Sequence, residues 1–488
     1  MMNKKYSVLL LCLAIMSVYT QLYAGLNQKI TLNQKITIYS SQKANSNMLE
    51  QQKNVELIPD IETENQLINV YPQLKYQEIL GFGGAFTETS AYNFAQVSDS
   101  VRRKIAEAYF DTEKGLGFNF CRTHINSCDF SITEYTNVAD NDNELKTFNI
   151  ANDRKYIIPF IKAAQNFNKD LFLFASPWSP PGWMKNNKSM IHGGKLLPEH
   201  YDTWARYMTK FFEEYKKEGI NFFGLTIQNE AKAVQTWESC IYTGKDEAVF
   251  ATKNLRPTLN KAGFNDLKIM IWDHNKERVL DRATESFAVK GAKDAIWGIA
   301  FHWYSGEHFD ALRMTHEMFP DKPLILTEFC RGGSSTNGSK AVVPYSDWGD
   351  VEAYANEMIG DFNNYMAAAT DWNMIVDLKG GPYHNRDGGV KAQLIVDKEN
   401  NTFTLGNIYY AVGHFSKFVK RGARRIGSSS YNDLLHVTAF QNPTGEVVVI
   451  VLNKAEQSFS PKLRIYDCTA GLDIPANSLT TLVIPAKQ

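Results

Sequence analysis

The sequence predicts an α/β protein: a (β/α)₈ TIM barrel with an associated antiparallel β-sandwich domain formed by both chain ends. Between residues 76 and 404, short apolar runs alternate with stretches of helical pattern, and there are eight such runs. The runs are continuously apolar, which is typical of parallel strands covered on both faces. Residues 25–75 and 405–488 instead hold short strand-like runs and turns, so we expect these two segments to meet in one small sheet domain.

The eight apolar runs are the expected barrel strands: residues 79–86, 118–123, 171–176, 222–229, 267–273, 296–302, 324–328 and 369–377. Two of the intervening segments have a clear helical period, residues 98–110 and residues 199–217, and Gly219 ends the second. An open doubly wound sheet is the alternative. It would place a Gly-rich nucleotide turn after the first strand, but we expect no helix directly after residues 81–84.

The N-terminus has the pattern of an export signal. Lys4-Lys5 precedes an apolar run over residues 6–19, and Leu22-Tyr23-Ala24 is a suitable cleavage site. We therefore expect residues 1–24 to be a signal peptide and the protein to be periplasmic, cell-surface or extracellular. The run is too short for stable membrane insertion. Cys12 has further apolar residues after it, which favours cleavage over a lipoprotein cysteine.

Composition excludes some partners. A net charge of -1 gives no reason to expect nucleic acid or an anionic membrane as a partner. Nine Trp, 23 Tyr and 29 Phe suit stacking on sugar rings, although composition by itself favours a large aromatic core. The five cysteines after residue 24 are few and odd in number, so they imply no disulfide framework, and none is spaced as a zinc site.

Two glutamates stand at the ends of predicted strands. Residues 222–229 run into Asn229-Glu230, and residues 324–328 end on Glu328. Active sites of such barrels lie at the C-terminal ends of the strands, so both carboxylates could flank one bond of a substrate. The other strand ends contribute polar and aromatic side chains: Arg122, His124, Asp129, Ser176, Trp178, Trp183, His302, Tyr304, Asp371, Trp372 and Asn373.

These residue types suit the hydrolysis of a glycosidic bond. One carboxylic acid protonates the leaving oxygen, and burial keeps such a group protonated near neutral pH. A second carboxylate attacks or activates water, and Arg122 could hold Glu328 ionised for that task. Asn229 could donate a hydrogen bond to the sugar 2-hydroxyl. From spacing alone, a rim salt bridge for each glutamate and simple packing for each tryptophan remain open.

Longer motifs carry a family resemblance that runs from about Gly81 to the C-terminus. They are GFGGAFTETSA (81–91), SCDFSI (127–132), ASPWSPPGWMK (175–185), TWARYMTKFFEEY (203–215), TIQNE (226–230), HWY (302–304), TDWNM (370–374) and GHFSKF (413–418). On these motifs the chain resembles glycoside hydrolase family 30, in the branch of the lysosomal acid β-glucosidases (glucosylceramidases) and their bacterial relatives.

The resemblance implies a barrel with a β-sandwich built from both chain ends, and hydrolysis with retention through a covalent glycosyl-enzyme. It implies Glu230 as the acid/base and Glu328 as the nucleophile. It implies a carbohydrate or glycolipid substrate, and neither a metal nor an organic cofactor. The family positions that line the sugar pocket correspond to Arg122, Asp129, Trp178, Asn229, His302, Tyr304 and Trp372.

The sequence departs from the family pattern at three places. Ala231 follows Glu230 where the family usually has proline, and Phe329 follows Glu328 where a small residue is usual. We expect Phe329 to alter the floor of the site. Asp387 aligns with an asparagine that contacts the sugar in the acid β-glucosidase.

Several activities fit this resemblance. The leading hypothesis is an exo-acting β-glucosidase, and an endo-β-1,6-glucanase is the alternative because a β-1,6 link leaves the ring hydroxyls free. β-Xylosidase and β-fucosidase activities also occur in the family. A non-catalytic sugar-binding protein on the same fold is the alternative of another class, and the presence of both Glu230 and Glu328 argues against it. A structural cell-surface protein would turn over no glycoside.

Overall fold

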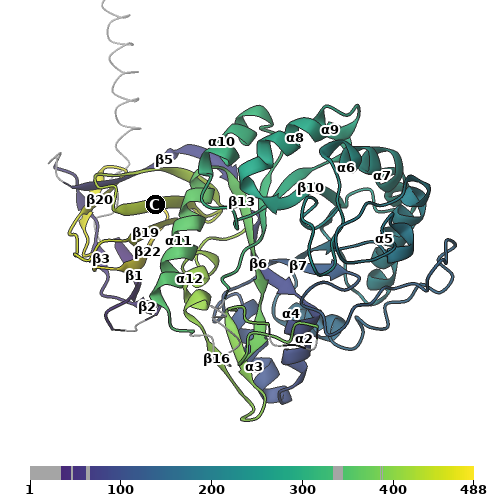
Figure 1. The fold of residues 1–488 in the computed structure, drawn as a ribbon. Coiled ribbons are helices and arrows are strands. Elements are labelled where there is room, and N and C mark those ends of the chain that lie inside the picture. Colours follow the sequence, from purple (N-terminus) through teal and green to yellow (C-terminus); the bar gives the residue numbers. More distant parts are fainter. Residues whose placement is uncertain are drawn as a thin grey trace, which may run out of the picture.

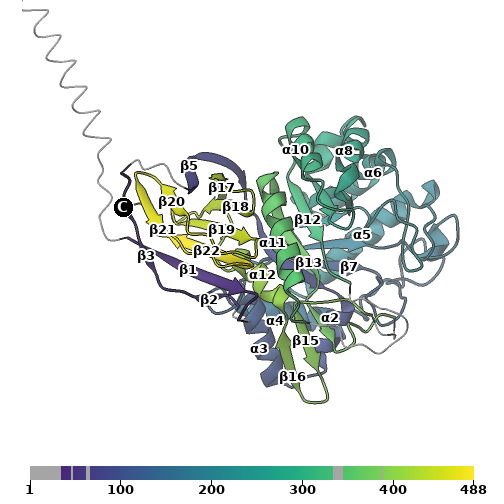
Figure 2. The ribbon, with the colours of Figure 1, turned by 60° about the vertical axis from the view of Figure 1, so that its left-hand side comes forward.

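The computed structural model describes residues 34–45, 48–61, 66–332, 345–384, 386 and 388–487. The expected signal segment with Cys12, and Asp387, lie outside the described residues. The described chain forms a barrel and, beside it, a sheet domain (Figure 1). The two parts remain distinct when the view is turned (Figure 2).

The barrel consists of eight parallel strands, as predicted. They hydrogen-bond in chain order, and β13 closes the ring against β6. The side chains of most of these strands are buried throughout, which is why the sequence shows continuous apolar runs rather than alternation. The strands are β6 (Gly81–Phe86), β7 (Phe120–Ile125), β8 (Phe172–Pro177), β9 (Gly224–Thr226), β10 (Lys268–Asn275), β11 (Gly298–His302), β12 (Leu324–Glu328) and β13 (Met366–Asn373).

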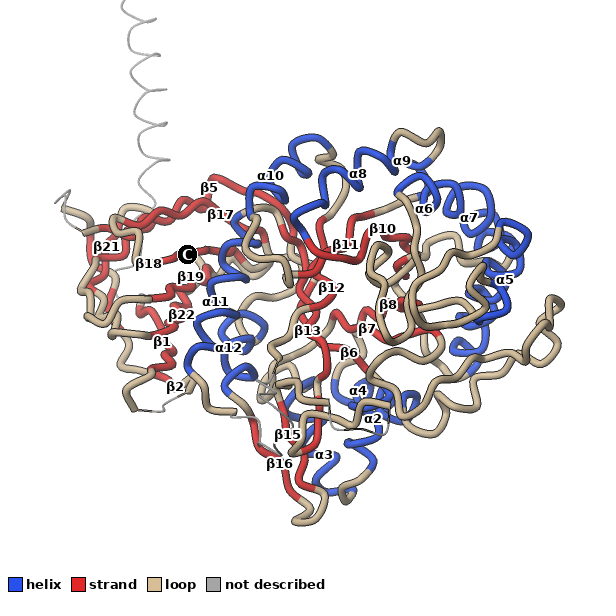
Figure 3. The backbone as a smooth tube through the Cα atoms, viewed as in Figure 1, coloured by secondary structure: helices blue, strands red, loops and turns tan. Residues whose placement is uncertain are grey.

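A ring of helices surrounds these strands (Figure 3). The two helices expected from the helical period are present as α3 and α5, and a 3₁₀ turn over Pro198–His200 leads into α5. The helices are α2 (Glu88–Ala95), α3 (Asp99–Phe110), α4 (Ile157–Phe167), α5 (Tyr201–Lys217), α6 (Gly244–Phe250), α7 (Arg256–Lys261), α8 (Val279–Phe287), α9 (Ala292–Ala295), α10 (Phe309–Met318) and α11 (Trp348–Asn363).

The start of the barrel corrects one expectation. Helix α2 does begin soon after β6, capped by the Thr87 side chain, which accepts a hydrogen bond from the Ser90 N–H. The glycines nevertheless lie within the strand and not in a turn before the helix. A Cβ added to Gly83 would stand 2.0 Å from the Phe120 carbonyl oxygen, so glycine here permits close packing of β6 on β7.

The last barrel strand also differs from its predicted range. It begins at Met366 and ends at Asn373, while Ile375–Asp377 forms a separate strand, β14. Strand β14 pairs with β15 (Leu394–Asp397), which pairs with β16 (Thr402–Leu405) in a small sheet that the sequence did not predict.

The sheet domain joins both ends of the chain, as predicted. Strand β1 pairs with the last strand, β22, and β5 pairs with β17. Ile36, Leu463 and Ala470 come from distant places in the strand order but share one buried cluster, so the sheet curls over its own core. The strands are β1 (Lys35–Gln42), β2 (Glu50–Gln51), β3 (Val55–Glu56), β4 (Ile58–Pro59), β5 (Leu67–Glu78), β17 (Arg424–Ser430), β18 (Leu435–Gln441), β19 (Val447–Asn453), β20 (Lys462–Ile465), β21 (Cys468–Gly471) and β22 (Ser478–Ile484).

Helices α11 and α12 (Asn407–Ser416) lie between the barrel and the sheet domain (Figure 1). The buried His414 of α12 bonds the Ser41 hydroxyl at 2.8 Å and the Thr481 hydroxyl at 2.8 Å. It thereby ties the barrel to both terminal strands at once. Cys121, Cys128, Cys240, Cys330 and Cys468 are free thiols. Among the helices of the described chain, none is both long and apolar enough to cross a membrane.

Candidate active site

The two predicted glutamates lie at the same end of the barrel. Glu328 is the last residue of β12, and Glu230 follows shortly after β9. His302 connects them: it is the register partner of Glu328 on β11, and its Nδ1 lies 3.5 Å from Glu230 Oε1. Both carboxylates are largely buried, with side chains 10% and 14% exposed for Glu328 and Glu230. The structure therefore brings both groups into one site.

Arg122 is the cation at the base of this site. Its fully buried guanidinium donates to Glu328 Oε2 at 2.7 Å and to Asp273 Oδ2 at 2.7 Å. It also donates to Asn229 Oδ1 at 2.8 Å and to Ser176 Oγ at 3.0 Å. The planar fork of an arginine suits such multiple contacts, whereas a lysine offers only a point charge. Because Arg122 occupies the amide oxygen of Asn229, the amide nitrogen remains to donate to a ligand.

Asp273, which sequence reasoning did not select, supports the site from β10. It accepts hydrogen bonds from Thr226 at 2.6 Å and Thr327 at 2.6 Å, in addition to the pair with Arg122. Its Oδ1 also lies 3.0 Å from His302 Nε2. Burial opposes its charge, but the Arg122 guanidinium and His302 hold the pKa of Asp273 well below its usual range. Asp273 is therefore an ionised anchor for Arg122 and His302.

The backbone around these groups is strained. Glu230, Trp272 and Asp273 have φ angles of 47°, 76° and 50°, in the left-handed region that these residue types rarely adopt. The Glu230 N–H donates to the Asp273 carbonyl at 2.8 Å, so the two unusual segments support one another. Strain of this kind gathers at functional sites because the surrounding structure must impose it.

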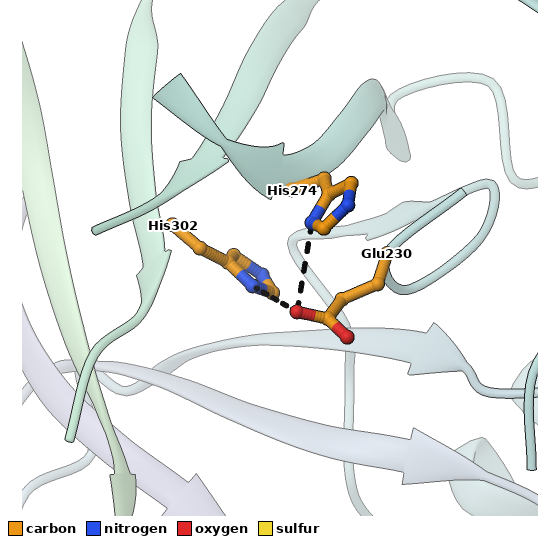
Figure 4. A group of neighbouring side chains, drawn as sticks. All are labelled: Glu230, His274 and His302. Carbon is orange, nitrogen blue, oxygen red and sulfur yellow. Dashed lines mark ion pairs between the residues drawn. The ribbon is translucent and has the colours of Figure 1, made fainter. Parts of the chain in front are cut away.

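Glu230 faces two histidines (Figure 4). Its Oε1 lies 3.5 Å from His274 Nδ1 and 3.5 Å from His302 Nδ1. Burial would raise the pKa of Glu230, but these two contacts hold it well below its ordinary value. Burial would lower the pKa of His302, but the charge of Glu328 and the bond to Asp273 raise it to about 9. In the free protein the proton of this pair therefore resides on His302, not on Glu230 as burial alone would predict.

The pKa of Glu328 is shifted in the opposite direction to that of Glu230. Burial raises its pKa, and the charges of Glu230 and Asp273 add to this effect, while His302 and Arg122 oppose it. The Tyr304 hydroxyl lies 2.9 Å from Glu328 Oε1 and donates to it. With Arg122 on Oε2 and Tyr304 on Oε1, both oxygens of this carboxylate are held in place, which is what an attacking group requires.

Asp129, Trp178 and Trp372 form one wall of the site. The two indoles stack with centroids 5.1 Å apart and planes inclined by 23°, and the Arg122 guanidinium lies 4.7 Å from the Trp178 ring. Asp129 Oδ1 is buried and has no hydrogen-bond partner among the described residues. Burial, and then the charges of Glu328, Glu238 and Glu230, raise the pKa of Asp129 well above its ordinary value. A sugar hydroxyl is a suitable partner for such a group.

Comparison with known proteins supports this architecture over most of the chain. Residues 79–419 match the domain family described as "Glycosyl hydrolase family 30 TIM-barrel domain". Residues 422–482 match the one described as "Glycosyl hydrolase family 30 beta sandwich domain". The chain belongs to glycoside hydrolase family 30.

Relatives in this family carry different names. The lysosomal acid glucosylceramidase of Mus musculus is 32% identical over 407 residues, which cover 80% of this chain and 78% of that protein. The crystal structure of SrfJ from Salmonella typhimurium has a TM-score of 0.87 at 34% identity, covering 92% of this chain and 99% of the other. The structure of the endo-β1,6-glucanase BT3312 has a TM-score of 0.81 at 26% identity, with coverage of 92% and 99%.

Phe329, where this chain departs from the family 30 pattern, does not lie where we expected it. The Phe329 ring is buried against Trp303 and Tyr354 of α11, with centroids 5.6 Å and 5.0 Å away, and not in the floor of the sugar site. Its carbonyl accepts the Trp372 N–H at 3.0 Å, so Phe329 positions the tryptophan wall through the backbone.

The structure thus brings all nine predicted residues to one end of the barrel and adds Asp273 and His274. A signal for the two additions was present, since the predicted run 267–273 ends on Asp273 and His274 follows it directly. The strand-end rule applied to β10 would have selected them. The role of the pair could not be read from sequence, because it depends on a bulge in β10 between Trp272 and His274.

Proposed function

We propose that this family 30 chain is a retaining β-glycosidase that hydrolyses β-glucosidic bonds, in the manner of a β-glucosidase or glucosylceramidase. The observation that carries this proposal is the arrangement around Arg122, which holds Glu328 on one side and Asn229, the neighbour of Glu230, on the other. Two carboxylates with distinct environments at one end of a barrel suit one nucleophile and one acid/base.

In the first step, a Glu328 oxygen attacks the anomeric carbon and the bond from that carbon to the leaving oxygen breaks. Glu230 donates a proton to the leaving oxygen. The Glu230–His302 pair holds that proton, because an imidazolium beside a carboxylate and an imidazole beside a carboxylic acid contain the same number of protons. Displacement of water by the substrate favours the second form, since fewer charges are then buried.

In the second step, water attacks the anomeric carbon, Glu230 accepts its proton, and the ester bond to Glu328 breaks. Asn229 donates its amide to the sugar 2-hydroxyl, a contact that strengthens in the oxocarbenium-like transition state. Asp129 accepts from ring hydroxyls, and the stacked Trp178 and Trp372 cover the sugar. No other group is needed for this sequence.

Asp129, Trp178 and Trp372 would contact the hydroxyls and ring of one glucose unit, which supports exo action. The sequence identity to glucosylceramidases also supports it. The likeness to an endo-β1,6-glucanase supports the second candidate, endo-β-1,6-glucanase activity, because a β-1,6 link leaves the gripped ring hydroxyls free. The N-terminal charge and hydropathy pattern supports our further proposal that the chain is exported.

Product analysis tests this proposal. The chain from Gly25 onward would be incubated with an aryl β-glucoside and, separately, with a β-1,6-glucan. We expect glucose from the aryl glucoside and little change in the polymer. Oligosaccharides from the glucan would instead support the endo-glucanase, and the absence of turnover with either substrate would contradict both activities. A Glu328→Gln variant is the control for contaminating enzymes.

A further inference from the structure

Glu230, His274 and His302 form a cluster that resembles a metal site. One ligand atom from each residue lies within 4.8 Å of the other two (Figure 4). Two histidine nitrogens and one carboxylate oxygen are a donor set that transition metals prefer, and Zn²⁺ sites of this composition are common. The sequence predicts no such site, because the three residues lie at the ends of three different strands.

The two histidines present the same ring nitrogen, Nδ1, to this cluster. Neither Nδ1 makes a hydrogen bond in the described chain, each faces Glu230 Oε1 at 3.5 Å, and His302 is completely buried. In the metal-free protein the Glu230–His302 pair holds a proton, and the ion would replace it, because metal binding to an imidazole releases its proton. The other ring nitrogen of His302 is held by Asp273 at 3.0 Å. Metal-binding histidines commonly have such a carboxylate on the second nitrogen, because it fixes the ring and makes the first nitrogen more basic.

The spacing matches a tetrahedral ion. With bonds of about 2.0–2.1 Å to Zn²⁺, two ligand atoms of a tetrahedron lie about 3.3 Å apart. The Glu230 oxygen lies 3.5 Å from His274 Nδ1 and 3.5 Å from His302 Nδ1. His274 is partly exposed, so rotation of its ring can close the third edge. The fourth position would then be open to water or to a ligand.

The surrounding charge favours a cation. The charge of Glu230 raises the pKa of both Glu328 and Asp129, so these carboxyl groups are close enough to act on one another, and the Asp273 carboxylate lies 3.0 Å from His302 Nε2. Arg122 bonds Glu328 and Asp273 and not Glu230. A divalent ion can therefore bind Glu230 without displacing Arg122.

We propose that Glu230, His274 and His302 bind one Zn²⁺ ion, or a similar divalent transition metal, and that this ion inhibits the protein by occupying Glu230. Imidazole nitrogens disfavour Mg²⁺ and Ca²⁺, which therefore do not compete. Binding follows from the donor geometry alone. The inhibitory consequence rests on the proposed function, because a metal on Glu230 removes the oxygen that transfers the proton.

Direct binding measurements test this site. Metal-free protein would be titrated with ZnCl₂ in a calorimeter, and with CoCl₂ while the visible absorption of tetrahedral Co²⁺ is recorded. We expect one ion per chain for the wild type. His274→Gln should weaken binding at least 10-fold, since even loss of a residue that only orients a ligand costs about 10–100-fold. His274→Asp restores a ligand and should recover much of the affinity.

His436→Gln is the control, because that histidine lies on β18 in the sheet domain. Its affinity for Zn²⁺ should equal that of the wild type. Equal affinities of the wild type and a folded His274→Gln variant would overturn the site, as would the absence of stoichiometric binding by the wild type. Hydrolysis of an aryl β-glucoside is followed in parallel. If metal-free protein shows no turnover, the proposed function fails while the binding result still decides on the site.

Discussion

Arg122 shows how one residue can organise a catalytic group. It contacts four side chains that come from four different strands or strand ends, and all of these contacts are buried. A buried cation of this kind is stable only because each carboxylate is paired and each remaining N–H has a partner. The arrangement fixes Glu328 and Asn229 relative to each other before any substrate arrives, which removes an entropic cost from the reaction.

Replacing Arg122 with lysine should therefore abolish the arrangement while keeping the charge. A single ammonium cannot contact Glu328, Asp273, Asn229 and Ser176 together. We expect kcat on an aryl β-glucoside to fall by at least about 100-fold, the cost of small misplacement in an active site. Arg256→Lys is the matched control and should retain activity, because that arginine donates to backbone carbonyls near α7. Near wild-type kcat for Arg122→Lys would contradict this role.

Asn229→Ala tests the contact with the sugar 2-hydroxyl. Loss of a hydrogen bond that strengthens in the transition state should cost about 2–3 kcal/mol, which is on the order of 100-fold in kcat/KM. The control lies in the substrate, since a 2-deoxyglucoside lacks the hydroxyl. With that substrate the wild type and the variant should differ little. An equal loss with both substrates would mean that Asn229 acts only through Arg122.

At the residue scale, sequence reasoning found the groups but not their charges. Glu230 and Glu328 could be selected because each ends an apolar run. Which of Glu230 and His302 carries the proton could not be predicted from sequence. It depends on His274, on the bulge in β10, and on Nδ1–Oε1 distances of 3.5 Å. Burial predicts a protonated Glu230, whereas two adjacent imidazoles outweigh burial in the free protein.

At the element scale, the barrel strands were predictable because each is a buried, continuously apolar run. The errors fall where this signal is weak. The start of β13 is Met366 followed by three alanines, and alanine is a poor strand former. Helix α12 was missed because eight of its ten residues are apolar, aromatic, glycine or histidine, so the sequence shows no polar stripe. The helix packs between the barrel and the sheet domain, and eight of its residues are buried.

Arg421 holds the opposite end of the barrel together. Its guanidinium donates to the backbone carbonyls of Leu80, Asn119 and Asp170, next to the starts of β6, β7 and β8, and lies 3.6 Å from the Phe172 ring centroid. Arg421→Met should lower the free energy of unfolding by about 2–4 kcal/mol through lost charged hydrogen bonds. Its kcat should be unchanged, because the site lies at the other end of the strands.

Denaturant unfolding of Arg421→Met checks this expectation, with Arg424→Met as the control. Arg424 is half-exposed and lies 3.6 Å from Glu78 at the surface, so its loss should change stability by less than about 1 kcal/mol. Equal effects of the two variants would show that Arg421 does not brace the barrel.

At the scale of the whole molecule, the meeting of the chain ends was predictable from the shift in pattern on either side of the barrel. The hydrogen bonds that join the chain ends to the barrel could not be predicted, because His414, Ser41 and Thr481 are far apart in sequence. A buried polar contact within the barrel is made by Asp153, which accepts hydrogen bonds from the hydroxyls of Tyr135 and Tyr215 at 2.8 Å each.

Asp153 should make stability depend on pH. Burial raises its pKa to about 7, although both tyrosines donate to it, while in the unfolded chain the pKa returns to about 4. Between these values the folded state binds more protons, so its contribution to stability is greatest below about pH 4 and is lost as pH rises to about 7. The loss amounts to at most about 4 kcal/mol.

Asp153→Asn removes this titration. Its amide oxygen can accept from one tyrosine hydroxyl while its NH2 group donates to the other. Urea unfolding from pH 4 to pH 8 should therefore show that the wild type loses stability relative to the variant as pH rises. The difference should level off once the pH is well above the folded-state pKa of about 7. Parallel pH profiles of the two proteins over the whole range would contradict the assignment.

The central claim is that Glu328 forms a covalent bond to the sugar, and trapping tests it most directly. A 2-deoxy-2-fluoro-β-glucoside with a good leaving group reacts with the nucleophile of a retaining enzyme and releases the sugar slowly. Mass spectrometry of the intact protein should show one fluoroglucosyl group per chain, and the labelled peptide should carry it on Glu328. A label on any other residue, or rapid turnover of aryl glucosides by Glu328→Gln, would contradict the account.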